Sequence, residues 1–298
     1  MANKSPRWQQ TSRDRDILAA LDLCPLEAKN LLALSQTFAQ PFGSLDRVRR
    51  TLKRLQAAGQ VQAWRYAVVG DCGGAAPLYY KLTLGGYRTL HEDAEAVPPT
   101  KRYLSELSVA RHQHQQHLTK YIVQTHVAAY RHGLRIVDSH AENTYRIETP
   151  LGPLFPDRRL TIVSPIGSRF TNCIELDNST ESLVSATSVD SIELKIKKYL
   201  HDLAACNYGY RVQFVVTRSS RRAQHIRQLV MRHQPQVRFA PFYVVSLDEY
   251  LSAENPFLKP IFASANAKRI GLLRVEAASL LQHKNKQPAT LLPAPALC

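Results

Sequence analysis

The stretch YRVQFVVT, residues 210–217, most constrains the fold, because it is almost continuously apolar and rich in β-branched residues. This composition is typical of a strand that is buried on both faces of a sheet and has a parallel neighbour. Amphipathic helices are predicted on either side of it, over 191–209 and 219–233, and a further strand is predicted within 237–251. Strands that alternate with helices in this way predict an α/β sheet covered by helices.

A long helix and several strands are predicted ahead of this region. Residues 103–133 contain no proline or glycine before Gly133, so one long helix is expected to end there. Its histidines lack a third ligand at metal-site spacing, even where His114 and His117 share a face, so solvated or capping roles are expected. Strands are then expected over 134–142, 144–150, 158–165 and 169–177. Residues 103–281 are therefore predicted to form one α/β domain with a mixed sheet.

The first ninety residues show a different pattern, in which three helices precede two strands. Helices are predicted over 13–23, 25–38 and 43–61, and strands over 60–69 and 77–90. Pro25 suits a first helical position, Ser44 suits an N-cap, and Gly59 suits a helix end. Three helices followed by a two-stranded hairpin is the layout of a winged helix-turn-helix domain. We expect it over residues 1–92, with a linker over 93–102.

The third predicted helix separates an apolar face from a basic one. In a winged helix this helix enters the major groove of DNA, and its flanks and the hairpin contact phosphates. The predicted DNA-binding residues are Arg47, Arg49, Arg50, Lys53, Arg54 and Arg65. The alternative is a winged-helix domain that contacts other proteins.

The net charge of the chain favours DNA binding over contacts with other proteins. Lys and Arg outnumber Asp and Glu by 39 to 24, which gives a formal charge of +15. The usual partner of such a protein is a polyanion, with nucleic acid first and an anionic membrane second. The sequence has no apolar run long enough to span a membrane and no signal peptide at its N-terminus, so a cytoplasmic protein without a membrane partner is expected.

Cysteine usage and the C-terminal composition add two expectations. The five cysteines are scattered and form no CxxC pair, which argues against a disulfide framework and against a structural zinc site. Residues 282–298 contain three prolines and little pattern, so a disordered tail is expected there.

Paired carboxylates mark the end of the strand predicted over 169–177. Glu175 and Asp177 lie two residues apart and therefore point to the same face of the strand, where they repel each other. Asp157, in a Pro-Asp pair, lies one hairpin earlier and can come to lie beside Glu175. Three such carboxylates suit a hard divalent cation, Mg²⁺ or Mn²⁺, which can support phosphodiester cleavage. The alternative is structural, because the following Asn-Ser-Thr suits a turn and a helix cap.

This arrangement resembles the restriction-endonuclease-like PD-(D/E)xK nuclease core, whose motif is Pro-Asp, a spacer and then Asp/Glu-x-Lys. The resemblance implies Asp157, Glu175 and Asp177 as catalytic and metal-binding residues, although Asp177 stands where the motif has lysine. Some members of that superfamily take the lysine from the following helix. The candidates there are Lys195, Lys197 and Lys198, and the spacing selects none of them. Lys195, the first of the three, is named as the candidate catalytic lysine. Glu142 is the nearest candidate for a further acidic residue.

The chain as a whole resembles the replication-relaxation family of bacterial mobile elements. The matching pieces include RRTLKRLQAAGQV, YYKLTLGGY, QHLTKYIVQTHVAA, PDRRLTI and ELDNSTES, in the order and spacing of the family. The family usually has glycine before Thr180, where this chain has Ser179. The resemblance implies a winged helix followed by a nuclease-like domain, with a role in plasmid replication and DNA relaxation.

Three functions are compatible with these features. The first is a metal-dependent nuclease that nicks or cleaves double-stranded DNA located by its own winged helix. The second is a non-catalytic DNA-binding initiator, accessory factor or regulator with a degenerate nuclease fold, and the third is a toxin or defence component. A homodimer or partner proteins from the same mobile element are compatible with the first two.

Overall fold

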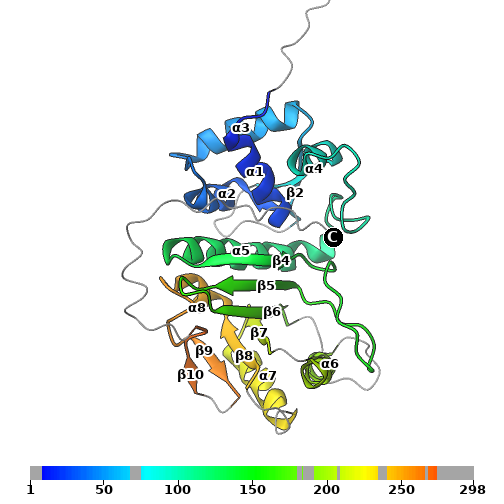
Figure 1. Cartoon of the computed structure of the whole chain (residues 1–298), viewed down its shortest axis with the longest axis vertical. Helices are drawn as coiled ribbons and strands as arrows, with labels where there is room; N and C mark the ends of the chain where they lie inside the picture. The colour runs from blue at the N-terminus through cyan, green and yellow to red at the C-terminus, as the bar shows by residue number, and fades with distance from the viewer. Residues whose placement is uncertain are drawn as a thin grey trace, which may run out of the picture. The chain divides into compact units, whose positions relative to one another are not determined.

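The computed structural model describes residues 9–67, 75–179, 183, 191–206, 209–233, 240–265 and 268–273. The chain divides into two compact units, and the division falls after Thr119, within helix α5 (His112–Arg131). Figure 1 labels the elements of both units. The predicted tail, 282–298, and most of the glycine-rich turn before Pro77 lie outside the described residues.

The first unit contains helices followed by a hairpin. Its elements are α1 (Ser12–Leu23), β1 (Leu26–Glu27), α2 (Ala28–Leu34), η1 (Ser35–Thr37), α3 (Leu45–Ala57), β2 (Val61–Arg65), β3 (Leu78–Leu82), α4 (Leu84–His91) and η2 (Val109–Arg111). The strands form an antiparallel sheet in the order β1-β3-β2. The predicted cap of α3 is confirmed, because the Ser44 hydroxyl accepts from the Arg47 backbone N–H. Val48, Leu52 and Leu55 of α3 are fully buried.

Two expectations for this unit were wrong in detail. Pro25 does not begin a helix, because Leu26 and Glu27 pair with β3 and the helix starts only at Ala28. The strand expected over 77–90 ends at Leu82, after which Thr83 caps α4 by accepting from the Gly86 N–H. A Cβ at Gly86 would lie 1.9 Å from the Gln60 carbonyl oxygen, so glycine permits this close approach of helix and strand.

The segment after α4 has no helix or strand until η2 begins. It is nevertheless tied to the first unit by hydrogen bonds. The Tyr103 hydroxyl donates to the Asp22 carbonyl oxygen at 2.6 Å, and Lys81 Nζ donates to the Ser105 carbonyl oxygen at 2.7 Å.

The second unit is built on one mixed sheet of seven strands, in the order β10-β9-β8-β7-β6-β5-β4. Its strands are β4 (Arg135–His140), β5 (Arg158–Val163), β6 (Arg169–Asp177), β7 (Arg211–Val216), β8 (Phe242–Ser246), β9 (Phe262–Ser264) and β10 (Arg269–Ile270). Its helices after α5 are α6 (Ile192–Ala205), α7 (Ser220–His233) and α8 (Leu247–Ser252). β7 is parallel to both β6 and β8, and the other pairs are antiparallel. The predicted α/β class with a mixed sheet is therefore confirmed.

Helices pack on both faces of this sheet (Figure 1). Tyr199 of α6 and Ile226 of α7 share a buried cluster with Cys173 and Phe214, which places both helices on one face of the sheet. On the other face, the Tyr121 hydroxyl of α5 donates to Gln213 of β7 at 2.7 Å. Glu175 and Asp177 lie two and four residues after Cys173, so they face α6 and α7.

Two expectations for this part of the chain also needed correction. The long helix begins at His112 instead of residue 103, although it does end before Gly133, which has a φ of 67°. Residues 144–150 form no strand, because only an isolated bridge joins Ile147 to Leu154. The strands expected over 134–142, 158–165 and 169–177 are present as β4, β5 and β6.

Candidate functional site

The register of β5 and β6 brings Asp157 beside Glu175. Arg158 pairs with Ile174 and Arg159 pairs with Cys173, so the residue before β5 lies opposite Glu175. Asp157 Oδ2 accepts a hydrogen bond of 2.7 Å from the Leu176 backbone N–H. The carboxylate is therefore fixed against the end of β6.

Two side chains of α6 bind Glu175. Lys195 Nζ donates to Glu175 Oε2 at 2.9 Å, and the Tyr199 hydroxyl donates to Oε1 at 2.6 Å. Lys195 and Tyr199 are four residues apart, so they lie on the same side of the helix. Glu175 is only 2% exposed, and both of its oxygens have a protein donor.

Burial controls the ionisation of this cluster. Loss of solvent raises the pKa of Glu175 above its ordinary value near 4.5, and the charge of Asp157 raises it further, against the opposing effects of Lys195 and Tyr199. Burial, followed by the charge of Glu175, raises the pKa of Tyr199 well above its usual range, so its hydroxyl remains a donor. Asp157 and Glu175 thus form a buried acidic pair beside one lysine.

Asp177 has a different partner. Arg222 of α7 donates from Nε to Oδ2 at 2.8 Å and from Nη2 to Oδ1 at 2.9 Å, which is a bidentate ion pair. The Asp177 side chain is 1% exposed and that of Arg222 is 12% exposed. The repulsion expected between Glu175 and Asp177 is thus relieved by two separate side-chain cations, and Asp177 is not joined with the other two carboxylates.

The three candidate lysines have different partners in the structure. Lys197 pairs with Glu193 at 2.9 Å on the same helix, and Lys198 Nζ donates to the Pro153 carbonyl oxygen at 2.9 Å. Lys195 is the one that reaches Glu175. Arg222 and Tyr199 were not found from the sequence, since neither belongs to a recognisable motif.

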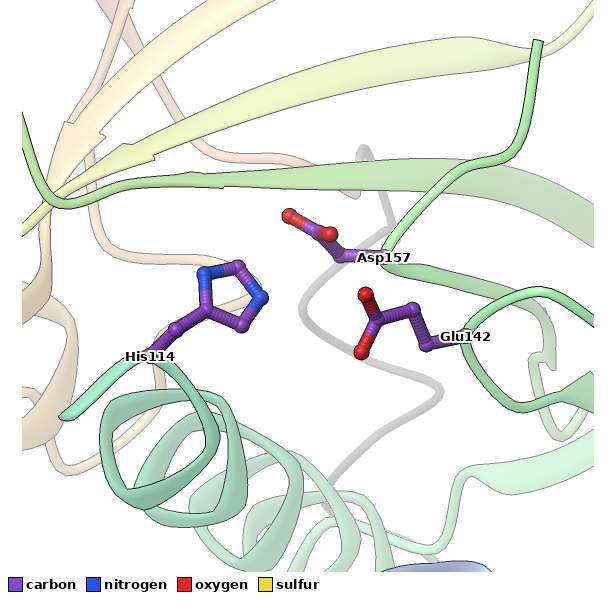
Figure 2. A group of neighbouring side chains, drawn as sticks. All are labelled: His114, Glu142 and Asp157. Atoms are coloured by element: carbon purple, nitrogen blue, oxygen red, sulfur yellow. The ribbon is translucent and has the colours of Figure 1, made fainter. Parts of the chain in front are cut away.

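Figure 2 shows Asp157 and Glu142 with their carboxylates projecting into the same space. The figure also labels His114. His114 belongs to the first compact unit and both carboxylates to the second. The site is therefore built from the second unit alone.

The donor set of the second unit is compatible with a hard divalent cation at Asp157 and Glu175. Both residues offer carboxylate oxygens, the ligand type that Mg²⁺ and Mn²⁺ prefer; Glu175 lies on β6, and Asp157 directly precedes the neighbouring strand β5. Burial is the main cause of the raised pKa of Glu175, but the charge of Asp157 raises it as well, and a cation between the two carboxylates would relieve that repulsion. Asp177 is instead held by Arg222, which donates to both of its oxygens.

The six predicted DNA-binding side chains are all exposed. Two of them have notable partners in the first unit. Arg54 forms an ion pair with the fully buried Asp14 of α1, which itself accepts from the Thr11 backbone N–H. Arg65 Nη1 donates to the Ala76 carbonyl oxygen at 3.3 Å. Arg54 therefore ties α3 to α1, a role that the helical pattern did not indicate.

No helix in the described ranges is both long enough and apolar enough to cross a membrane. A family model described as replication-relaxation matches residues 24–208, more than half of the chain. The chain belongs to the replication-relaxation family. No curated protein and no solved structure matches it.

The replication-relaxation match places most of the site inside the family region. Residues 24–208 include α3, Asp157, Glu175 and the two side chains of α6 that bind it, whereas Arg222 lies outside. The family description points to a role in replication and relaxation, which is a DNA-related function.

Proposed function

We propose that this protein binds double-stranded DNA of a plasmid or other mobile element and nicks it with a metal-dependent site in its second unit, during replication, relaxation or transfer. The observation that carries the proposal is the hydrogen bond between Lys195 of α6 and Glu175, with Asp157 beside them. A lysine, a glutamate and an aspartate are the residues that the PD-(D/E)xK motif combines, and here the lysine comes from the following helix.

The first unit supports DNA recognition as a winged helix. Three helices precede the β2–β3 hairpin, and α3 exposes five cations opposite its buried Val48, Leu52 and Leu55. A basic helix face above an apolar packing face is what major-groove binding requires. The net charge of +15 adds a favourable long-range field.

In the second unit, Asp157 and Glu175 would hold Mg²⁺ or Mn²⁺. Bound there, such an ion supplies an activated water and neutralises charge that develops on the phosphate. Lys195 would add a positive charge on the side of α6, and Tyr199 holds Glu175 in place from the same helix. Arg222 and Asp177 join the end of β6 to α7 and so support the site from outside.

The test is incubation with supercoiled plasmid in Mg²⁺ or Mn²⁺, followed by separation of nicked from supercoiled DNA. The wild-type protein should nick the plasmid, and Asp157→Ala and Glu175→Gln should abolish nicking while DNA binding persists. Nicking that persists in both variants would reject this site.

A second function is favoured by one observation. Asp177, which stands where the nuclease motif has lysine, is held in a bidentate ion pair with Arg222. A DNA-binding scaffold without chemistry would keep this ion pair and the Lys195–Glu175 pair for stability alone. Such a protein would bind DNA and show no metal-dependent nicking under any of the conditions above.

A further inference from the structure

A basic hollow lies on the first unit, between the N-terminal turn of α1 and the exposed face of α3. It has a volume of about 350 Å³ and is lined by Arg13, Phe42, Arg47, Arg50, Thr51 and Arg54. Four of the six lining residues are arginines, and one of them, Arg13, comes from outside α3. The hollow therefore brings a residue of α1 next to the basic face of α3, a proximity that the sequence pattern of α3 does not predict.

The arginines that line this hollow outnumber the carboxylates near them. Arg54 is paired with Asp14, and Arg13 lies near enough to Asp16 to lower its pKa, against the stronger effect of burial. Arg47 and Arg50 form no ion pair with any described residue. A surplus of guanidinium groups in one concave place favours an anion, and the planar guanidinium is suited to phosphate oxygens in particular.

Contacts with neighbouring side chains fix the position of the Arg13 guanidinium. Its guanidinium carbon lies 5.1 Å from the centre of the Phe42 ring, and Nη2 donates to Gln40 Oε1 at 3.2 Å. Its Nε is buried without a hydrogen-bond partner among the described residues. Because stacking on an aromatic ring reduces the freedom of the side chain, less entropy is lost when the guanidinium binds an anion.

We propose that this hollow is a phosphate site, in which Arg13, Arg47 and Arg50 bind one phosphate group and Arg54 is held in place by Asp14. The proposal rests on the proposed DNA binding by the first unit and adds a defined contact from α1. The volume is sufficient for a phosphate together with its sugar. The arginines of α3 that line it are exposed, so the phosphate can belong to a continuous backbone or to a free nucleotide.

The experiment compares Arg13→Gln with Arg15→Gln in the full chain. Arg15 lies on the same helix, pairs with Glu92 and does not line the hollow, so it is the matched control. Binding to a DNA duplex is measured by fluorescence anisotropy across a series of salt concentrations, and thermal melting checks that both variants fold. A parallel titration uses inorganic phosphate and a deoxynucleoside monophosphate, followed by calorimetry.

If the phosphate belongs to a DNA backbone, Arg13→Gln should weaken duplex binding about fivefold at physiological salt and lower the salt slope by about 0.9, as expected for one lost contact. If it belongs to a free nucleotide, the monophosphate should bind the wild type and not Arg13→Gln, while duplex binding is the same in both. Equal duplex binding by Arg13→Gln and Arg15→Gln, with no phosphate or nucleotide binding, would overturn the site. A wild type that binds phosphate at the hollow but no DNA would retain the site and reject the proposed DNA binding.

Discussion

Removing the cation from the buried Asp177–Arg222 pair should destabilise the second unit strongly. In Arg222→Met the side chain keeps much of its volume, and Asp177 is left as a charge that is 1% exposed and has lost both guanidinium hydrogen bonds. Breaking a buried ion pair by removing one partner costs about 3–5 kcal/mol. For a unit of this size, that corresponds to a decrease in melting temperature of roughly 6–20 °C.

Differential scanning calorimetry of three variants tests this reasoning. Arg221→Met changes an exposed neighbour on α7 and should stay within about 0.5 kcal/mol of the wild type. The double variant Asp177→Asn with Arg222→Met removes both charges and should recover most of the loss. Equal melting of Arg222→Met and Arg221→Met would show that the ion pair does not stabilise the fold.

Three further predictions concern stability. Because the pKa of Glu175 is higher in the folded than in the unfolded state, the protonated side chain stabilises the fold below about pH 4.5, and this contribution is lost as the pH rises through the folded-state pKa. Urea titrations at a series of pH values should therefore show the wild type losing stability relative to Glu175→Gln between these two pKa values. Arg54→Ala leaves the buried Asp14 without its cation and should cost about 1–2 kcal/mol, whereas Arg47→Ala should be nearly neutral in the same urea assay. Gly86→Ala places a methyl group against a backbone carbonyl oxygen and should cost about 1–3 kcal/mol, measured by thermal melting.

Most helices and strands could be predicted from the sequence, because hydrophobic periodicity, caps and backbone preferences depend on residues close together in the chain. The apolar run of β7 and the helices around it were found from periodicity, and Ser44 and Gly133 mark helix limits through caps and backbone preference. The start of α2 was missed because Leu26 pairs with Tyr80, more than fifty residues later. That pairing depends on tertiary structure and overrides the preference of Pro25 for a helix start.

The site was only partly predictable for the same reason. One hairpin separates Asp157 from Glu175, so their proximity follows from sequence spacing and is present in the register of β5 and β6. The partner of Asp177 is Arg222, which lies 45 residues later on another helix. The choice of Lys195 over its neighbours depends on the rotation of α6 against the sheet, which the sequence does not determine.

The rate of plasmid nicking by Lys195→Met tests the central claim most directly. Lys197→Met is the matched control, because Lys197 lies on the same helix and pairs with Glu193 away from Glu175. In Mg²⁺ or Mn²⁺ the wild type and Lys197→Met should nick supercoiled DNA at similar rates, and Lys195→Met should be slower by about 100-fold or more, as expected for loss of a charge that stabilises the transition state. Equal nicking by the two lysine variants, or no metal-dependent nicking by the wild type, would contradict the assignment of Lys195, Glu175 and Asp157 as a nuclease site.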